Sequence, residues 1–178
     1  MRPSGIEGSY SKAARQLLEA TDKHSARQVI DELRQQLTTR LPDRETFKTR
    51  FYKLKFSRNY TTHKKLIQYI FSHIETVNQT THEFKPDSMT LEHILSQSSG
   101  TEDFVSAIGN LLPLGAELNE QAGNKTLDKK IEVYKKSDFV LTKEFAQSNP
   151  QQWNEEKIQD RTNELAERCY DYMWPPHE

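Results

Sequence analysis

The stretch that decides the fold lies between residues 89 and 136 and contains LEHIL (91–95), GNL (109–111), LN (118–119) and GNK (123–125). On both sides of it apolar residues recur at helical spacing. Within it, turn signals at Gly109-Asn110 and Gly123-Asn124 alternate with the brief apolar run 111–114. We therefore expect a small unit that is not simply helical inside a mostly α-helical protein.

The rest of the chain predicts helices with one apolar face each. The expected helices cover residues 9–20, 25–41, 43–56, 61–77, 127–136, 141–147 and 154–173. Residues 78–88 (NQTTHEFKPDS) are polar and contain Pro86, which indicates a connector. The sequence therefore predicts a helical subdomain over residues 1–88 and a second subdomain over residues 89–178 that ends in helices.

Composition limits the class of protein. The chain has 178 residues, of which 29% are charged, and a net charge of −1. The single cysteine, Cys169, excludes an internal disulfide and a cysteine-rich zinc site. No apolar run approaches the ~20 residues of a membrane span, and the N-terminus does not resemble a signal peptide. We expect a soluble, cytoplasmic protein with no membrane partner.

The basic residues are clustered although the net charge is near zero. Nine Lys and Arg lie between residues 40 and 65, and a second cluster lies between residues 125 and 136. Two such patches could follow the phosphates of a nucleic acid. Ordinary solvated helix faces remain the alternative explanation.

The motifs themselves match the pattern of HNH (His-Me finger) nucleases: an acidic residue directly before a histidine, then two asparagines further on. In that pattern a short strand ends in the histidine, a second strand and a helix follow, and a hydrated metal lies between them. Phosphodiester hydrolysis needs a base for the attacking water and a cation for the phosphate. A neutral imidazole suits the first task, and Mg²⁺ prefers oxygen ligands. His93 is thus the expected base, and Glu92 and Asn119 are the expected ligands of Mg²⁺, for which Mn²⁺ could substitute.

Glu92 is the weaker of these assignments. Neighbouring residues of a strand point to opposite faces, so Glu92 joins His93 in one site only if the end of the strand turns it inward. Gly109-Asn110 could also be only a turn, and Asn119 only a helix cap. The order and spacing of all four residues together indicate a nuclease: Glu92, His93, Asn110 and Asn119.

Three longer stretches resemble the C-terminal HNH-type domain of GmrSD-like modification-dependent restriction endonucleases. These are TLEHILSQ (90–97), IGNLLPLGAELNEQAGNKTLDKKIEVYKKSDFVLTKEFA (108–146) and QQWNEEKIQDRTNELAE (151–167). The resemblance implies an α+β fold, mostly α with a small ββα-metal motif, and Mg²⁺-dependent cleavage of DNA in defence against phage. It also implies that His93 is the base, that Asn110 holds the loop of the base, and that Glu92 and Asn119 lie beside the metal.

The resemblance further implies partners. Lys125 would lie near a DNA phosphate, and the other basic residues would hold the DNA backbone. The full set expected to bind nucleic acid is Arg50, Lys53, Lys55, Arg58, Lys125, Lys129 and Lys130. Related proteins carry an N-terminal ParB-like nucleotide-binding domain, which this sequence lacks, so recognition of modified DNA is expected outside it. Ser96 replaces the proline usual in the family, which affects the rigidity of the loop after His93.

Two other functions compete with the nuclease. One is a DNA-binding or regulatory module that keeps the fold without catalysis, against which the intact Glu92, His93, Asn110 and Asn119 argue. The other is a helical scaffold for protein interactions, which salt-dependent DNA affinity would contradict.

Overall fold

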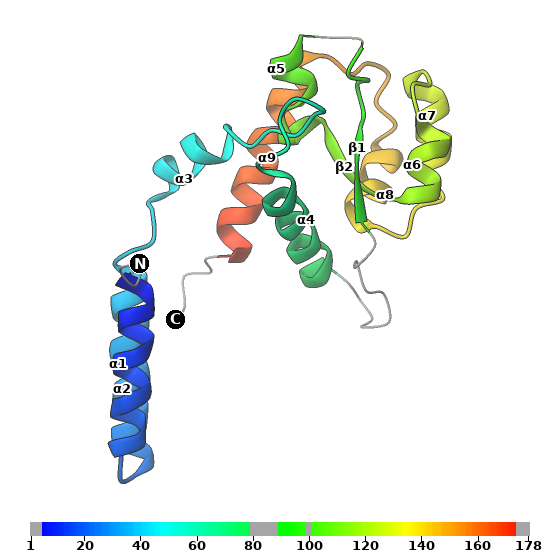
Figure 1. Cartoon of the computed structure of the whole chain (residues 1–178). Helices are drawn as coiled ribbons and strands as arrows, with labels where there is room; N and C mark the ends of the chain where they lie inside the picture. Colours follow the sequence, from blue (N-terminus) through cyan, green and yellow to red (C-terminus); the bar gives the residue numbers. More distant parts are fainter. Residues whose placement is uncertain (1–4, 79–88, 99–100, 174–178) are drawn as a thin grey trace. The chain divides into compact units, whose positions relative to one another are not determined.

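The computed structural model describes residues 5–78, 89–98 and 101–173. The described part is mostly helical and contains a two-stranded antiparallel sheet, which confirms an α+β protein dominated by helices (Figure 1). The chain divides into two compact units, residues 1–43 and 44–178. No described helix combines the length and the apolar character needed to cross a lipid bilayer.

The first unit is a helical hairpin of α1 (Gly5–Glu19) and α2 (Lys23–Thr38). Asp22 starts α2 with a capping box: its carboxylate accepts a hydrogen bond from the Ser25 backbone N–H at 2.8 Å, and the Ser25 hydroxyl accepts one from the Asp22 N–H. Among the described residues of this hairpin, only Ser9 and Ala13 are buried. Local capping and helix-to-helix contact therefore hold this unit, and an extended apolar core does not.

The second unit contains the other elements. They are α3 (Arg44–Phe51), α4 (Lys64–Asn78), β1 (Met89–His93), α5 (Glu102–Val105), the short 3-10 helix η1 (Ile108–Asn110), β2 (Leu111–Gly115), α6 (Ala116–Ala122), α7 (Leu127–Tyr134), α8 (Val140–Ser148) and α9 (Glu155–Met173). Strand β1 runs antiparallel to β2, with Met89 opposite Gly115 and His93 opposite Leu111. β1 thus ends at His93, where η1 leads into β2.

The sheet lies between two apolar clusters, because alternate residues of a strand point to opposite faces. Leu111 packs into a cluster formed chiefly by α3, α4 and α9, whereas Leu112 packs into one formed by α6, α7 and α8. Cys169 is buried in the first cluster, and burial raises the pKa of its thiol to about 12. Cys169 is therefore a core residue of the last helix.

The contacts place the boundary between units after Asp43, and not after residue 88 as the sequence indicated. Phe51 of α3 and Phe71 of α4 lie in the same apolar cluster as Leu91 and Leu111 of the sheet. The two helices complete the core beneath the sheet, so they cannot form a separate subdomain with the N-terminal hairpin. Of the predicted connector 78–88, Asn78 is the last residue of α4, and residues 79–88 lie outside the described part of the chain.

Two close contacts fix the elements around the end of β1. A Cβ on Gly109 would clash with the Ile158 carbonyl oxygen and the Thr162 hydroxyl of α9, so only glycine lets η1 approach that helix this closely. On α4, the fully buried Glu75 carboxylate accepts hydrogen bonds from the backbone N–H groups of Val140 (2.7 Å) and Leu141 (2.9 Å). Glu75 thereby caps α8 from a distant helix, and burial raises the pKa of its carboxyl group.

Candidate active site

His93, the last residue of β1, is held by a backbone carbonyl. Its Nε2 lies 2.8 Å from the Phe56 carbonyl oxygen, and the Phe56 ring stacks on the imidazole with centroids 5.7 Å apart. A carbonyl only accepts hydrogen bonds, so Nε2 carries the proton and donates it. The lone pair of the neutral ring is then on Nδ1, to which the Gln97 side-chain amide donates across 3.4 Å.

The backbone segment that carries the Phe56 carbonyl is fixed by hydrogen bonds to residues 106–108. The Phe56 N–H donates to the Ser106 carbonyl at 2.8 Å, and the Ile108 N–H donates to the Leu54 carbonyl at 3.1 Å. An isolated bridge between Lys55 and Ala107 completes this short pairing. The segment after α3 is thus pinned beside η1, which brings its carbonyl to the histidine.

Burial lowers the pKa of His93 below its ordinary value of 6.5. The hydrogen bond to Phe56 acts in the opposite direction, and the nearby Lys130 charge adds to the lowering. The imidazole is therefore neutral near pH 7, the state in which Nδ1 can accept a proton.

Asn110 ties down the chain immediately after His93. Its Oδ1 accepts hydrogen bonds from the Leu95 N–H (2.8 Å) and from Trp153 Nε1 (3.0 Å), and its Nδ2 donates to the carbonyls of Leu95 (2.9 Å) and Val105 (2.8 Å). Asn110 is completely buried. All four hydrogen-bonding positions of the amide are used, so the side chain fixes one backbone path for the loop.

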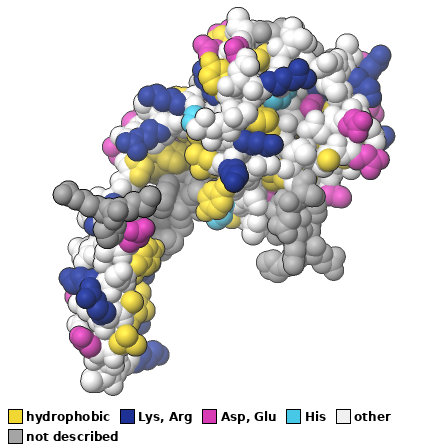
Figure 2. Space-filling model, viewed as in Figure 1, with side chains coloured by type: hydrophobic (Ala, Val, Ile, Leu, Met, Phe, Trp, Pro, Cys, Tyr) yellow, Lys and Arg dark blue, Asp and Glu magenta, His cyan; other side chains and the backbone are white. Residues whose placement is uncertain are grey.

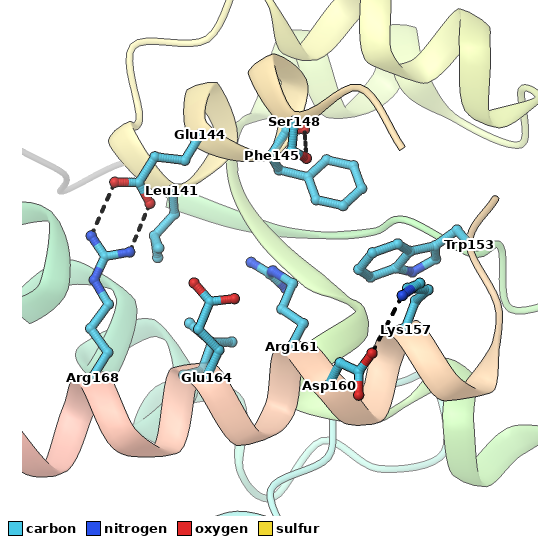
Figure 3. Close-up of a pocket in the computed structure, with 11 residues that line it drawn as sticks. Leu141, Glu144, Phe145, Ser148, Trp153, Lys157, Asp160, Arg161, Glu164 and Arg168 are labelled. Carbon is cyan, nitrogen blue, oxygen red and sulfur yellow. Dashed lines mark hydrogen bonds and ion pairs between the residues drawn. The ribbon is translucent and has the colours of Figure 1, made fainter. Parts of the chain in front are cut away.

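Helix α9 fixes the backbone on both sides of Asn110. Arg161 Nη1 donates to the carbonyls of Gly109 (2.7 Å) and Leu111 (2.8 Å), the two neighbours of Asn110. Burial lowers the pKa of Arg161 to about 10, which still leaves it cationic at neutral pH. Figure 3 shows Arg161 beside Trp153 in a cavity of about 270 Å³, where Arg168 pairs with Glu144 and Lys157 pairs with Asp160.

Glu92 lies in a buried charged cluster on the other face of β1. Its Oε1 accepts hydrogen bonds from Lys130 Nζ (2.7 Å) and from the Tyr134 hydroxyl (2.9 Å), and Lys130 Nζ also donates to the His93 carbonyl. Lys130 is 1% exposed and Glu92 is 5% exposed. Burial raises the pKa of Tyr134, and the Glu92 charge and hydrogen bond add to it, so this hydroxyl stays protonated.

The assignment of Lys130 to DNA binding is therefore wrong in this structure. Lys130 and Tyr134 are four residues apart on α7, so they share the face that packs on the sheet. The ammonium is enclosed there and already bonded to Glu92 and to main chain. Lys129, one position earlier, is exposed.

Asn119 on α6 has a fixed amide orientation. The Thr90 hydroxyl donates its hydrogen to the Leu114 carbonyl at 2.6 Å, so Thr90 Oγ1 can only accept from Asn119. Asn119 Nδ2 donates to that oxygen at 2.7 Å. The amide oxygen Oδ1 is thereby directed away from Thr90 and left available as an acceptor or ligand.

Glu92, His93 and Asn119 line one cavity of about 530 Å³ at the end of β1. Although Glu92 and His93 leave opposite faces of the strand, both line this cavity, and Asn119 lines it from α6. Asn110 is not among the lining residues, because it is completely buried against the backbone of Leu95. The cavity is also lined by Phe56, Arg58, Leu91, Ser96, Gln97, Ser98, Gly123, Asn124 and Lys130.

The donor atoms at this cavity fit a hydrated Mg²⁺. Hydrogen bonds from the described residues reach Oε1 of Glu92 but not Oε2, and Asn119 Oδ1 would be a second oxygen ligand. Mg²⁺ keeps several waters and takes phosphate oxygens, so two protein oxygens suffice. No group of three or more His, Cys, Asp or Glu that could bind a metal occurs in the described part.

The chain matches the model of a known protein family. The family model for the C-terminal domain of GmrSD restriction endonucleases matches residues 41–168. The chain belongs to this family. Separate searches of curated proteins and of solved structures found no match. The GmrSD C-terminal match begins close to the observed unit boundary and covers both asparagines, His93 and Glu92, and it indicates a nuclease-related domain of restriction enzymes.

The other basic residues that we expected to bind DNA lie in several separate places on the GmrSD C-terminal domain. Arg58 lines the cavity, and Arg50, Lys53, Lys125 and Lys129 are exposed. Lys55 is partly buried and pairs with Asp103 at 2.7 Å. On the face shown in Figure 2, the Lys and Arg side chains form several separate groups, with acidic and uncharged side chains between them.

Several residues that shape the candidate site of this GmrSD domain could not be recognised from their residue type or spacing. They are Phe56, Thr90, Gln97, Tyr134 and Arg161. Phe56 acts through its carbonyl, which every residue type has, so no motif could reveal it. Tyr134 and Arg161 did fall within the segments that resemble the family, but only the structure shows what they contact.

Proposed function

We propose that this domain hydrolyses DNA phosphodiesters with the aid of a divalent cation, as the HNH-type nuclease centre of a restriction protein that acts against foreign DNA. The observation that carries the proposal is the state of His93. A neutral imidazole with its Nδ1 lone pair lies at the same cavity as a carboxylate oxygen and an amide oxygen. In this proposal β1, β2 and α6 form the ββα-metal motif.

His93 acts as the general base. The Phe56 carbonyl fixes the Nε2–H tautomer, so Nδ1 takes the proton from the attacking water. The same carbonyl then stabilises the imidazolium that forms. Gln97, which donates to Nδ1 here, gives up that contact when water approaches. Asn110 keeps the loop after His93 in place, and this role limits the motion of the base.

Glu92 Oε2 and Asn119 Oδ1 would hold the cation, Mg²⁺ or Mn²⁺. When bound, the cation neutralises the charge on the scissile phosphate and on the leaving oxygen. Arg58 lies at the same cavity and binds a phosphate oxygen. The exposed Arg50, Lys53, Lys125 and Lys129 contact flanking phosphates, while an N-terminal ParB-like nucleotide-binding domain of the full-length protein would select the modified DNA.

Cleavage of supercoiled plasmid tests this function. We expect wild-type protein with Mg²⁺ to nick or linearise the plasmid, and His93→Ala to lower the rate by about 10²–10⁴-fold, the usual contribution of a general base. Both proteins should be inactive with a chelator. His73→Ala is the matched control, because His73 stacks on Tyr69 and does not line the cavity. Equal nicking by wild type and His93→Ala would remove the proposed mechanism, and absence of nicking by wild type would favour a DNA-binding module without catalysis.

A further inference from the structure

The cavity has an unusual charge balance for a cation site. Of the residues that line it, Arg58, Glu92 and Lys130 carry full charges, apart from the neutral His93. Glu92 is the only acid among them, and Lys130 Nζ lies 2.7 Å from its Oε1. The formal charge of the lining is therefore +1 before any ligand arrives.

The Lys130–Glu92 pair is enclosed within the folded protein. Both side chains are buried, and Lys130 is held at a second point by the His93 carbonyl. Charges act strongly on one another in such a region, because water does not screen them as it does at the surface. The ammonium therefore opposes a second cation at Glu92 Oε2, on the same carboxylate.

A phosphodiester has the opposite effect. Its negative charge is attracted by Arg58 and Lys130, and it supplies further oxygen ligands to a cation. A cavity lined in this way suits the anion by itself and suits the divalent cation only when the anion is present.

We propose that the Lys130–Glu92 pair couples cation binding to DNA binding, so that the domain takes up its divalent cation together with a DNA phosphate. This inference rests on the proposed nuclease function and specifies that the divalent cation and DNA bind cooperatively. Coupling between two ligands is reciprocal, so the cation must tighten DNA binding by the same factor as DNA tightens cation binding.

Titration with Mn²⁺, followed by electron paramagnetic resonance, tests the coupling. The full chain carrying His93→Ala keeps the DNA intact, and a short duplex is the second ligand. We expect at least tenfold tighter Mn²⁺ binding with DNA than without, after subtraction of Mn²⁺ bound by the duplex alone. Asn119→Ala should abolish this gain, which assigns it to the cavity. An unchanged Mn²⁺ affinity with and without DNA would overturn the inference.

The role of Lys130 is tested by charge removal. Introduced into the His93→Ala protein, Lys130→Met should raise the Mn²⁺ affinity without DNA at least tenfold and reduce the gain from DNA. Lys143→Met removes the same charge from a surface residue that pairs with Asp138 and does not line the cavity, and it should change neither value. Equal effects of the two substitutions would contradict the proposal, and if Lys130→Met does not fold, the titration with and without DNA decides alone.

Failure of the inference and failure of the function give different results. Tight Mn²⁺ binding without DNA, together with plasmid cleavage that depends on His93, removes the coupling and keeps the nuclease. Absence of His93-dependent cleavage at every Mg²⁺ concentration removes the nuclease, whatever the Mn²⁺ titration shows.

Discussion

Glu92 and His93 are neighbours in sequence, yet the two faces of β1 hold them by different means. Glu92 is held by side chains, through the Lys130 ammonium and the Tyr134 hydroxyl. His93 is held by main chain, through the Phe56 carbonyl, and the loop after it is fixed by Asn110 through the backbone of Leu95. The acid thus depends on the identity of its partners, whereas the base depends on the path of the backbone.

The largest effect is expected on the side-chain face. Lys130→Met leaves the Glu92 carboxylate buried without its cation, so we expect the free energy of unfolding to fall by about 3–5 kcal/mol. Adding Glu92→Leu should recover part of this loss, because no uncompensated charge remains. Urea unfolding measures both. Lys135→Met, whose partner Glu132 is exposed, should cause no measurable change. A single variant no less stable than wild type would show that the pair is not buried as described.

A smaller effect is expected where the backbone path is decisive. Gly109→Ala forces η1 away from α9, at a cost of about 1–3 kcal/mol for overpacking. Because Asn110 moves with it, plasmid cleavage should slow more than the loss of stability explains. Gly115→Ala is the matched control, since an added Cβ there meets no atom within 4 Å. Similar cleavage rates and unfolding midpoints for the two variants would refute a main-chain constraint on the base.

The smallest effect concerns Glu75, a buried carboxylate held by main-chain N–H groups and not by an ammonium. Burial raises its folded-state pKa above the ordinary 4.5. The folded protein then retains this proton while the unfolded chain releases it, so Glu75 makes stability fall as pH rises from about 4.5 to the raised pKa. Urea unfolding of wild type and Glu75→Gln across this range should show that slope only in wild type. Parallel profiles would contradict it.

The helices were largely predictable because their apolar spacing is regular. The expected helix over 43–56 is the informative exception, since α3 ends at Phe51. Helical periodicity continues through Leu54, but the backbone of Leu54 and Phe56 bonds instead to Ile108 and Ser106. These partners lie some fifty residues away in sequence, so no local pattern could place the end of the helix.

The site was predictable where residue type carries the chemistry. The motif indicated His93, Glu92 and Asn119, and these three line one cavity. Lys130 was misassigned because it lies in a run of basic residues, where composition indicates an exposed patch. Lys130 differs from Lys129 in that it lies on the same face of α7 as Tyr134. The structure shows that this face packs on the sheet, which the sequence alone did not indicate.

The bond from His93 to Phe56 spans 37 residues of sequence. A fragment of this chain that begins at Met89 would retain both strands, both asparagines and the histidine. It would lose the Phe56 carbonyl, so no hydrogen bond would fix the proton of the imidazole on Nε2. Protein engineers who graft the LEHIL hairpin onto another scaffold would therefore have to transplant the segment around Phe56 as well.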